Sequence, residues 1–313
     1  MKQIVLLTVG LIMAAASSYA QEMPEKEEKK SNVQTYTPSV LLKKGQVELK
    51  YFNNIYSQDH WFNEDGEKTP LAQRQTFYGG QFSGLFGTSA SARVNVGFDF
   101  SIKGVHYDSD SAASPFKVLR FESSDTSRMV LSSFGPKIKI SPFKRLTHFS
   151  IQSAFWIPLA PNLEQNPWLD YNRYIWWNQF FYDHSFLNGK VQIFTEVDLL
   201  FRIAKDRSKA HQLTTPVSFF TSYFPTSKST VYGMIQVSPL FQEEAQENAD
   251  GSTTFLHQTD SKIVGAGYFA QAGFGSKYQL TPTFELEVLY TNFFAGDSQG
   301  AGYTINLGMR WLY

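Results

Sequence analysis

The chain has 313 residues, its 28 basic residues are balanced by 28 acidic ones, and it contains no cysteine. The balanced charge argues against a nucleic-acid-binding protein, which would carry a basic excess. The missing cysteines exclude disulfides, thiolate catalysis and cysteine-ligated zinc. Aromatic residues make up 16% of the chain, yet its mean hydropathy of -0.28 is too low for a bundle of membrane helices and fits strands in which only alternate residues meet lipid.

The N-terminus has the features of a secretory signal peptide. Lys2 supplies the positive start, residues 4–16 form an apolar stretch, and Ser18-Tyr19-Ala20 provides small residues before a cleavage site. We therefore expect residues 1–20 to be removed. Residues 21–45 should follow as a periplasmic tail, whose mixed-charge run at 22–31 is either a solvated segment or a docking site for a partner.

The C-terminal segment alternates between apolar and polar residues. Thr304, Asn306, Gly308 and Arg310 fill most even positions, so one face of a strand is polar and the other apolar. The apolar face consists of Tyr303, Ile305, Leu307, Met309, Trp311 and Tyr313. After the signal peptide, no apolar run reaches the roughly 18 residues of a membrane helix, so the chain crosses a membrane as a closed barrel or not at all.

This terminal strand resembles that of bacterial outer-membrane barrel proteins, which is amphipathic and ends on an aromatic residue. The resemblance implies that these six apolar residues form the signal read by the barrel-assembly machinery. It also implies an integral outer-membrane location with both termini in the periplasm. The signal peptide ending before Gln21 and the charged tail are similar to those of outer-membrane proteins of the Bacteroidota.

The same alternation recurs along the mature chain and predicts an all-β, closed antiparallel transmembrane barrel within residues 46–313. We expect about 12 strands, at 46–58, 72–86, 91–107, 126–141, 146–157, 172–184, 189–203, 213–224, 230–243, 258–278, 283–294 and 301–313. Short connections alternate with mostly longer ones, as expected for short periplasmic turns and long extracellular loops. Asp65-Gly66 and Asp250-Gly251 mark hairpin tips in two of the long connections, because glycine readily adopts positive φ.

Alternation also predicts which charges face the lumen. The predicted lumen-lining residues that set selectivity are Arg93, Asp99, Lys103, Lys137, Lys139, Glu196, Asp198, Arg202, Glu285 and Glu287. In one arrangement Arg93, Lys137 and Lys139 face the carboxylates across a water-filled pore. In the other, ion pairs cross-link the interior and close it to solutes. A barrel of this size lies between filled and open barrels, so side chains and infolded loops decide conductance.

Two further patterns leave alternatives open. Gly265, Gly267, Gly273 and Gly275 either clear space in the lumen or ease the bending of their strand. An aromatic group is expected at the membrane interface as a girdle, although Trp168 could instead stack on a sugar or peptide ligand. The group comprises Trp61, Phe62, Trp168, Tyr171, Tyr174, Trp176 and Trp177.

Catalytic motifs are weak. His148 and Ser150 share one strand face, and outer-membrane phospholipases also use a histidine and a serine on a barrel strand. Here the pair should face the lumen, and Ser150 lacks the Asn-Gly that follows the phospholipase serine. The six histidines are scattered, so we expect no enzyme, cofactor or metal.

The sequence thus predicts a narrow channel for passive passage of small polar solutes. The alternative is a non-conducting accessory barrel of a larger outer-membrane complex. Expected partners are membrane lipid, lipopolysaccharide and the assembly machinery, with envelope proteins contacting the tail or the long loops, and no nucleic acid.

Overall fold

The computed structural model describes residues 39–110, 112–248, 252–258 and 261–313. The expected signal peptide and the charged run at 22–31 lie outside these residues. Within them, no helix is long and apolar enough to cross a membrane. The strands are β1 (Val47–Phe62), β2 (Lys68–Gly87), β3 (Val94–Asp108), β4 (Ser127–Ile140), β5 (Phe149–Pro158), β6 (Tyr174–Phe186), β7 (Val191–Ile203), β8 (Gln212–Thr214), β9 (Val217–Tyr223), β10 (Ser229–Glu243), β11 (Gln246–Glu247), β12 (Thr253–Thr254), β13 (Ile263–Thr281), β14 (Phe284–Asp297) and β15 (Gln299–Leu312).

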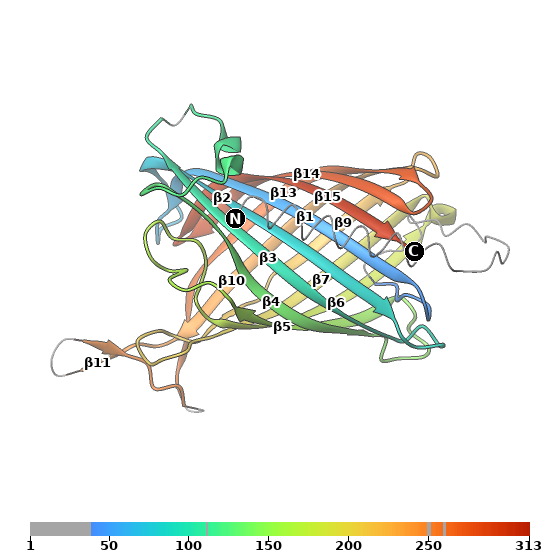
Figure 1. The fold of residues 1–313 in the computed structure, drawn as a ribbon, viewed down its shortest axis with the longest axis horizontal. Helices are drawn as coiled ribbons and strands as arrows, with labels where there is room; N and C mark the ends of the chain where they lie inside the picture. The colour runs from blue at the N-terminus through green and yellow to red at the C-terminus, as the bar shows by residue number, and fades with distance from the viewer. Residues whose placement is uncertain (1–38, 111, 249–251, 259–260) are drawn as a thin grey trace.

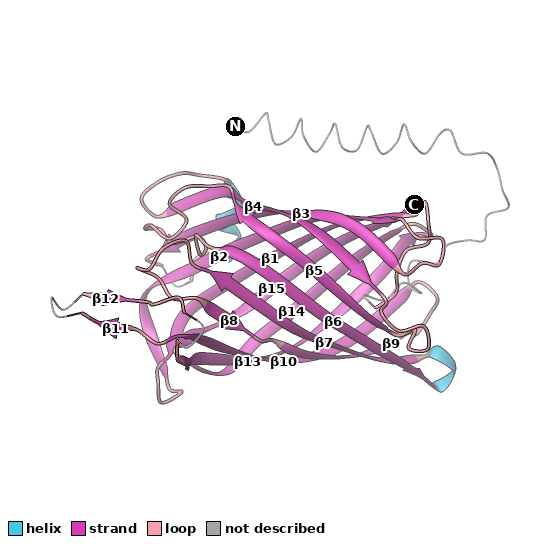
Figure 2. Ribbon diagram, turned by 90° about the horizontal axis from the view of Figure 1, so that it is seen from below, coloured by secondary structure: helices cyan, strands magenta, loops and turns pink. Residues whose placement is uncertain are grey.

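The strands form one closed antiparallel barrel (Figures 1 and 2). Each strand pairs with its neighbour in sequence, and β15 returns to pair with β1, so that Lys50 lies opposite Arg310. In the described part of the chain, the 13 strands of this sheet occupy twelve positions around the barrel. The reason is that β8 and β9 share one position, where they lie end to end between β7 and β10. Closure leaves no free edge, which is what a membrane-spanning sheet requires. The predicted fold class is confirmed.

The eighth predicted strand, 213–224, is interrupted. Pro216 has no N–H to donate to the ladder, so β8 ends at Thr214 and β9 begins at Val217. The two backbone groups at the break still find partners: Thr215 N donates to Pro239 O, and Pro216 O accepts from Asp198 N. The hydrogen bonding to β7 and β10 therefore continues past the break between β8 and β9, with a local irregularity at Pro216.

Connections of two kinds distinguish the two ends of the barrel. The turn end carries the joins after β2, β4, β6, β9 and β13, and the loop end carries those after β1, β3, β5, β7, β10 and β14. At the loop end, β1 and β2 continue as a hairpin whose tip contains Gly66 at φ +76°, as the Asp-Gly pair predicts. The second Asp-Gly pair lies outside the described residues, but the flanking β11 and β12 pair with each other.

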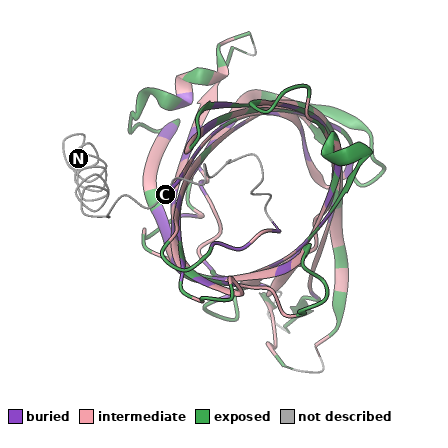
Figure 3. Cartoon of the chain, turned by 90° about the vertical axis from the view of Figure 1, so that its right-hand side faces the viewer, coloured by how far each residue is buried: buried purple, intermediate pink, exposed green. Residues whose placement is uncertain are grey.

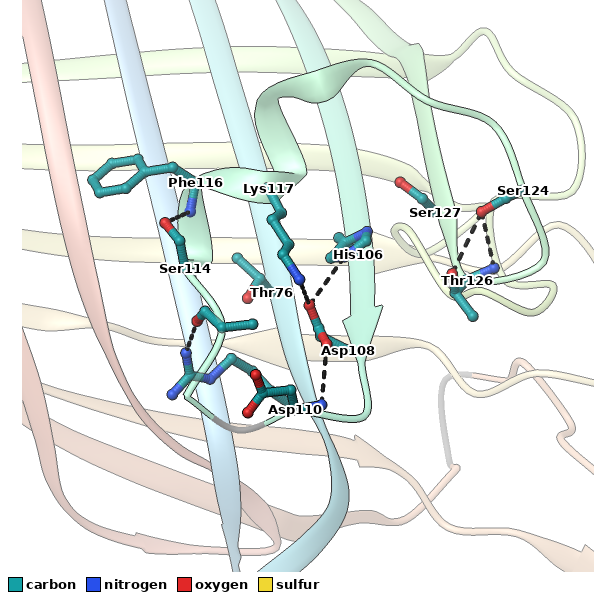
Figure 4. A network of polar contacts seen from close by, with 12 residues as sticks. Thr76, His106, Asp108, Asp110, Ser114, Phe116, Lys117, Ser124, Thr126 and Ser127 are labelled. Atoms are coloured by element: carbon teal, nitrogen blue, oxygen red, sulfur yellow. Dashed lines mark hydrogen bonds and ion pairs between the residues drawn. The ribbon is translucent and has the colours of Figure 1, made fainter.

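The loop between β3 and β4 folds back over the outer surface of the barrel. Its short 3-10 helix, η2 (Pro115–Arg120), buries Val118 against Ile55 and Tyr78. A polar network fixes the loop: Lys117 Nζ lies 2.5 Å from Asp108 Oδ2, and Asp108 Oδ1 accepts from Asp110 N (Figure 4). Phe116 and Phe121 remain exposed on this loop.

The aromatic prediction is only partly correct. Trp176 is exposed on the outer face, as a girdle residue should be, but Trp177 points inward and donates its indole N–H to Asp198. Two adjacent strand residues must face opposite sides of the sheet, so both could not belong to a girdle. Phe62 is also buried, against Phe293 and Ala301.

Candidate functional site

The inner wall of the barrel is lined by charged and amide side chains. Asp99, Lys137, Lys139, Asp198 and Glu285 are all nearly buried, with 2% to 8% of each residue exposed. Their alternate neighbours, such as Val96, Ile138 and Leu286, are exposed on the outer surface. The predicted alternation therefore holds along these strands.

Ion pairs within strands and between neighbouring strands line the half of the lumen that is next to the turn end. Lys137 Nζ lies 2.8 Å from Asp99 Oδ1 and also donates to Ser83 Oγ. Glu48 lies between Lys50, at 2.8 Å, and Arg310, at 4.0 Å. Arg310 in turn reaches Glu285 at 3.5 Å. These pairs lie along the wall, so each charge is neutralised beside its own strand.

Other interactions reach across the lumen. Lys50 on β1 interacts electrostatically with Glu196 on β7, and Lys139 on β4 interacts with Glu48 on β1. In the strand order, β1 and β7 lie on opposite sides of the barrel. Long charged side chains from facing walls therefore extend toward each other at this level.

Glu196 and Asp198 stand apart from the ion-paired residues. They share the inner face of β7, where Gln179 Nε2 donates to Glu196 at 2.7 Å and Trp177 Nε1 donates to Asp198 at 3.0 Å. Among the described residues neither carboxylate forms an ion pair within 4.0 Å. Neutral donors hold them in place, and the two carboxyl groups also share a hydrogen bond, which requires one of them to carry a proton. The pair therefore gives this part of the wall at most one negative charge.

The segment before β1 lies inside the turn end of the barrel. Asn95 on β3 is fully buried, and its side-chain amide makes two hydrogen bonds with Leu42, to N at 2.8 Å and to O at 2.9 Å. Lys139 Nζ donates to Val40 O, and Ser39 Oγ donates to Asp183 on β6. Seen from this end, the segment runs inside the ring of strands (Figure 3). Residues expected to form a tail thus narrow the lumen.

The connection between β5 and β6 folds into the loop end. Leu163 and Leu169 pack on Val105, which shares the inner face of β3 with Asp99. Asp170 lies 3.6 Å from Lys103, another predicted lumen residue. The guanidinium of Arg202 lies 4.8 Å from the ring centroid of Tyr171. Trp168 contacts Phe77 and Tyr171 edge-on. Inward-folded segments, the one before β1 and the one between β5 and β6, therefore narrow both ends of the lumen.

Several predicted lumen residues lie elsewhere or have local partners. Arg93 lies at the turn end, where its guanidinium donates to Ser141 O and Pro142 O rather than facing a carboxylate. Glu287 lies 3.3 Å from Lys277 and accepts from Tyr232. Of the four glycines, Gly275 leaves room for the ring of Tyr232, since a Cβ there would come within 2.4 Å of it. That space is filled by a side chain.

His148 and Ser150 do not form a catalytic pair in this arrangement. His148 Nδ1 lies 3.4 Å from Asp183 Oδ2, and its side chain is half exposed at the turn end. Ser150 is completely buried, and its Oγ has no hydrogen-bond partner among the described residues. A substrate has no access to this hydroxyl.

Three residues that the sequence left scattered meet at the loop end. One donor atom each from His211, Glu243 and His257 lies within 4.8 Å of the others. His211 precedes β8, Glu243 ends β10, and His257 lies in the connection to β13. Burial, and then the neighbouring His257, lowers the pKa of His211 below its ordinary value. In the sequence, the neighbouring strands predicted at 213–224 and 230–243 could have indicated that His211 and Glu243 meet. No sequence signal places His257 beside them.

Comparison with solved structures finds this fold at low sequence identity. An outer-membrane channel from Pseudomonas putida is 13% identical, with a TM-score of 0.60 over 92% of this chain and 100% of that one. The β domain of the Bordetella autotransporter BrkA is 11% identical, with a TM-score of 0.52 over 86% of this chain and 99% of that one. No family model and no curated protein sequence matches the chain. The chain has the fold of Gram-negative outer-membrane β-barrel proteins, which supports an outer-membrane location.

Proposed function

We propose that the protein is a narrow outer-membrane channel for passive passage of small polar solutes, with a preference for cations. The observation that carries this proposal is the Glu196–Asp198 pair. An isolated carboxylate is costly to bury in a dry interior, so the negative charge that this pair retains without an ion pair needs water beside it. A wet wall with negative character favours passage of cations over anions.

The polar lining also supports passage of solutes rather than of apolar molecules. Between the two narrowed ends, Lys50, Lys139, Glu48 and Glu196 interact across the lumen. Facing charges of both signs can exchange hydrogen bonds with a small polar solute as it passes. Large solutes would have to displace the segment at 39–44 or the loop at 159–173.

A second candidate is a non-conducting accessory barrel of a larger complex. The ion pairs Lys137–Asp99, Arg310–Glu285 and Lys277–Glu287 favour it, because a cross-linked interior strengthens the wall without needing transport. The exposed Phe116 and Phe121 of the outer loop would then contact a partner. Purification in mild detergent distinguishes the two, since an accessory subunit should retain stoichiometric partners.

Other expectations remain part of the proposal. We place both termini on the periplasmic side, which puts the longer loops outside, next to lipopolysaccharide. The apolar face of β15 would be read by the assembly machinery during insertion. A Bacteroidota source rests on residues 18–31, outside the described part of the chain. We assign no catalytic role, in line with the buried Ser150.

Neutralising the unpaired carboxylates should change ion selectivity. In the double variant Glu196→Gln, Asp198→Asn, the potassium-to-chloride permeability ratio should fall by about twofold or more, because a charged lining sets ion preference. Reversal potentials across a planar bilayer under a salt gradient measure this ratio. Salt should stay at or below about 0.1 M, where screening extends over about 10 Å.

The matched control removes the same charges outside the lumen. Glu64→Gln with Asp65→Asn, at the tip of the β1–β2 hairpin, should leave the ratio unchanged. An unaltered reversal potential in the lumen variant would count against the proposed role of Glu196 and Asp198.

A further inference from the structure

We propose that His211, Glu243 and His257 form a binding site for a divalent transition-metal ion of the zinc class at the loop end of the barrel. The site lies away from the charged lumen, and its existence does not depend on the channel function.

The β ladder fixes two of the three residues. Gln212 on β8 lies opposite Gln242 on β10, and one step further Glu243 N donates to His211 O at 3.1 Å. His211 and Glu243 are therefore directly across from each other on paired chains. This backbone pairing holds their side chains in one neighbourhood.

The loop after β10 brings the third residue into place. His257 N donates to Glu243 Oε1 at 2.6 Å, and Phe255 N donates to Arg207 O at 3.0 Å. His257 has φ +54°, a left-handed conformation that few residues other than glycine adopt, although histidine is among those that do so more often. This backbone conformation costs free energy. It places the imidazole ring of His257 over the ring of His211, with ring centroids 3.8 Å apart.

The donor set suits a zinc-class ion. The side chain of Glu243 is 2% exposed, and its closest basic partner among the described residues is His257, at 3.6 Å. Two imidazole nitrogens and one carboxylate oxygen form a common three-ligand set for zinc and leave one position open. Imidazole donors favour zinc, nickel and copper over calcium and magnesium, which prefer oxygen ligands.

Hydrogen bonds around the rings indicate which nitrogens would bind. His257 Nε2 lies 3.6 Å from Glu243 Oε2 and 2.9 Å from Lys209 O, which it can reach only as a donor. An ion bound between Glu243 and this nitrogen must therefore displace the contact with Lys209 O. His211 Nδ1 accepts from Ala204 N at 3.0 Å. An ion must displace this contact or turn the ring over. Both histidines therefore rearrange when an ion binds.

A bound ion would brace the mouth of the barrel. It would join the β7–β8 connection to the β10–β13 connection. The first of these also contacts the inward-folded loop, because Lys209 pairs with Glu164 and Gln212 accepts from Arg173 at 3.3 Å. Ion binding would thus hold three segments of the loop end together.

Calorimetric titration of zinc chloride into the tag-free, detergent-solubilised mature protein tests the site. We expect one ion per chain, with no comparable heat from calcium or magnesium. His257→Asn and Glu243→Gln should each weaken binding by about 100-fold, since even partners outside the ligand set typically contribute 10- to 100-fold. His211→Asn should weaken it to a similar extent, because each of the two rings supplies one ligand.

His184→Asn is the matched control, because His184 is exposed on β6 near the turn end. It should bind zinc as the unaltered protein does. Migration of unboiled samples on a gel verifies that each variant is folded. Folded protein that binds no zinc, or zinc binding that survives in the His211→Asn, His257→Asn double variant, would overturn the proposal.

Discussion

A refolded chain that lacks residues 21–43 should conduct more current than the full mature chain. The described part of this segment lies inside the turn end, where Leu42 is 2% exposed and packs on Leu85 and Leu312. Removing it should widen the lumen at that end. We expect single-channel conductance to rise by about twofold or more, because side chains and infolded chain decide the opening of a barrel of this size.

Two substitutions in the full-length chain separate this effect from a folding defect. Leu42→Asp places a charge in the apolar contact with Leu85 and Leu312, so the segment should leave its seat and conductance should rise. Lys43→Asp changes the next, exposed residue and should leave conductance as it was. Equal conductance in all of these chains would show that the segment does not limit the pore.

Replacing Asp99 by Asn should destabilise the barrel strongly. The side chains of Asp99 and Lys137 are 2% and 4% exposed, so the substitution leaves a buried ammonium without its counter-charge. Breaking a buried pair in this way costs about 3 kcal/mol or more of the free energy of unfolding. Guanidinium unfolding in detergent micelles, followed by tryptophan fluorescence, measures the loss.

The double variant Asp99→Asn, Lys137→Met tests whether the cost comes from the unpaired charge. Removing both partners should recover most of the lost stability, since neither charge then remains buried. Asp65→Asn, on the exposed hairpin tip, serves as the control and should change stability little. If Asp99→Asn unfolds at the same denaturant concentration as the unaltered protein, the pair does not hold the wall together.

The barrel could be predicted from the sequence because strand alternation is a local signal. Thr304, Asn306 and Arg310 all occupy even positions on β15, so they had to share a face. The same rule placed Asp99, Lys137 and Glu285 inside. Even the break at Pro216 has a local cause, namely the missing N–H.

Partners within the lumen could not be predicted in the same way. Whether Lys137 faces Glu196 across the pore or pairs with Asp99 on the next strand depends on register and strand tilt. Alternation gives the side of the sheet but not the height along it. The predicted transverse arrangement therefore contained several of the right residues without their pairing.

Segments outside the strands carried the least information. Leu41 and Leu42 follow a highly charged run, and nothing local shows that Asn95 binds the backbone at Leu42. The meeting of His211 with His257 likewise requires two loops to fold against each other. Such contacts depend on tertiary structure, so sequence periodicity is silent about them.

Single-channel recording of the purified mature protein in a planar bilayer is the most direct test of a wet, narrow lumen. We predict discrete, small conductance steps from protein that migrates as folded when unboiled, with potassium carried more readily than chloride. Folded protein that inserts into the bilayer and leaves it electrically silent would contradict the account.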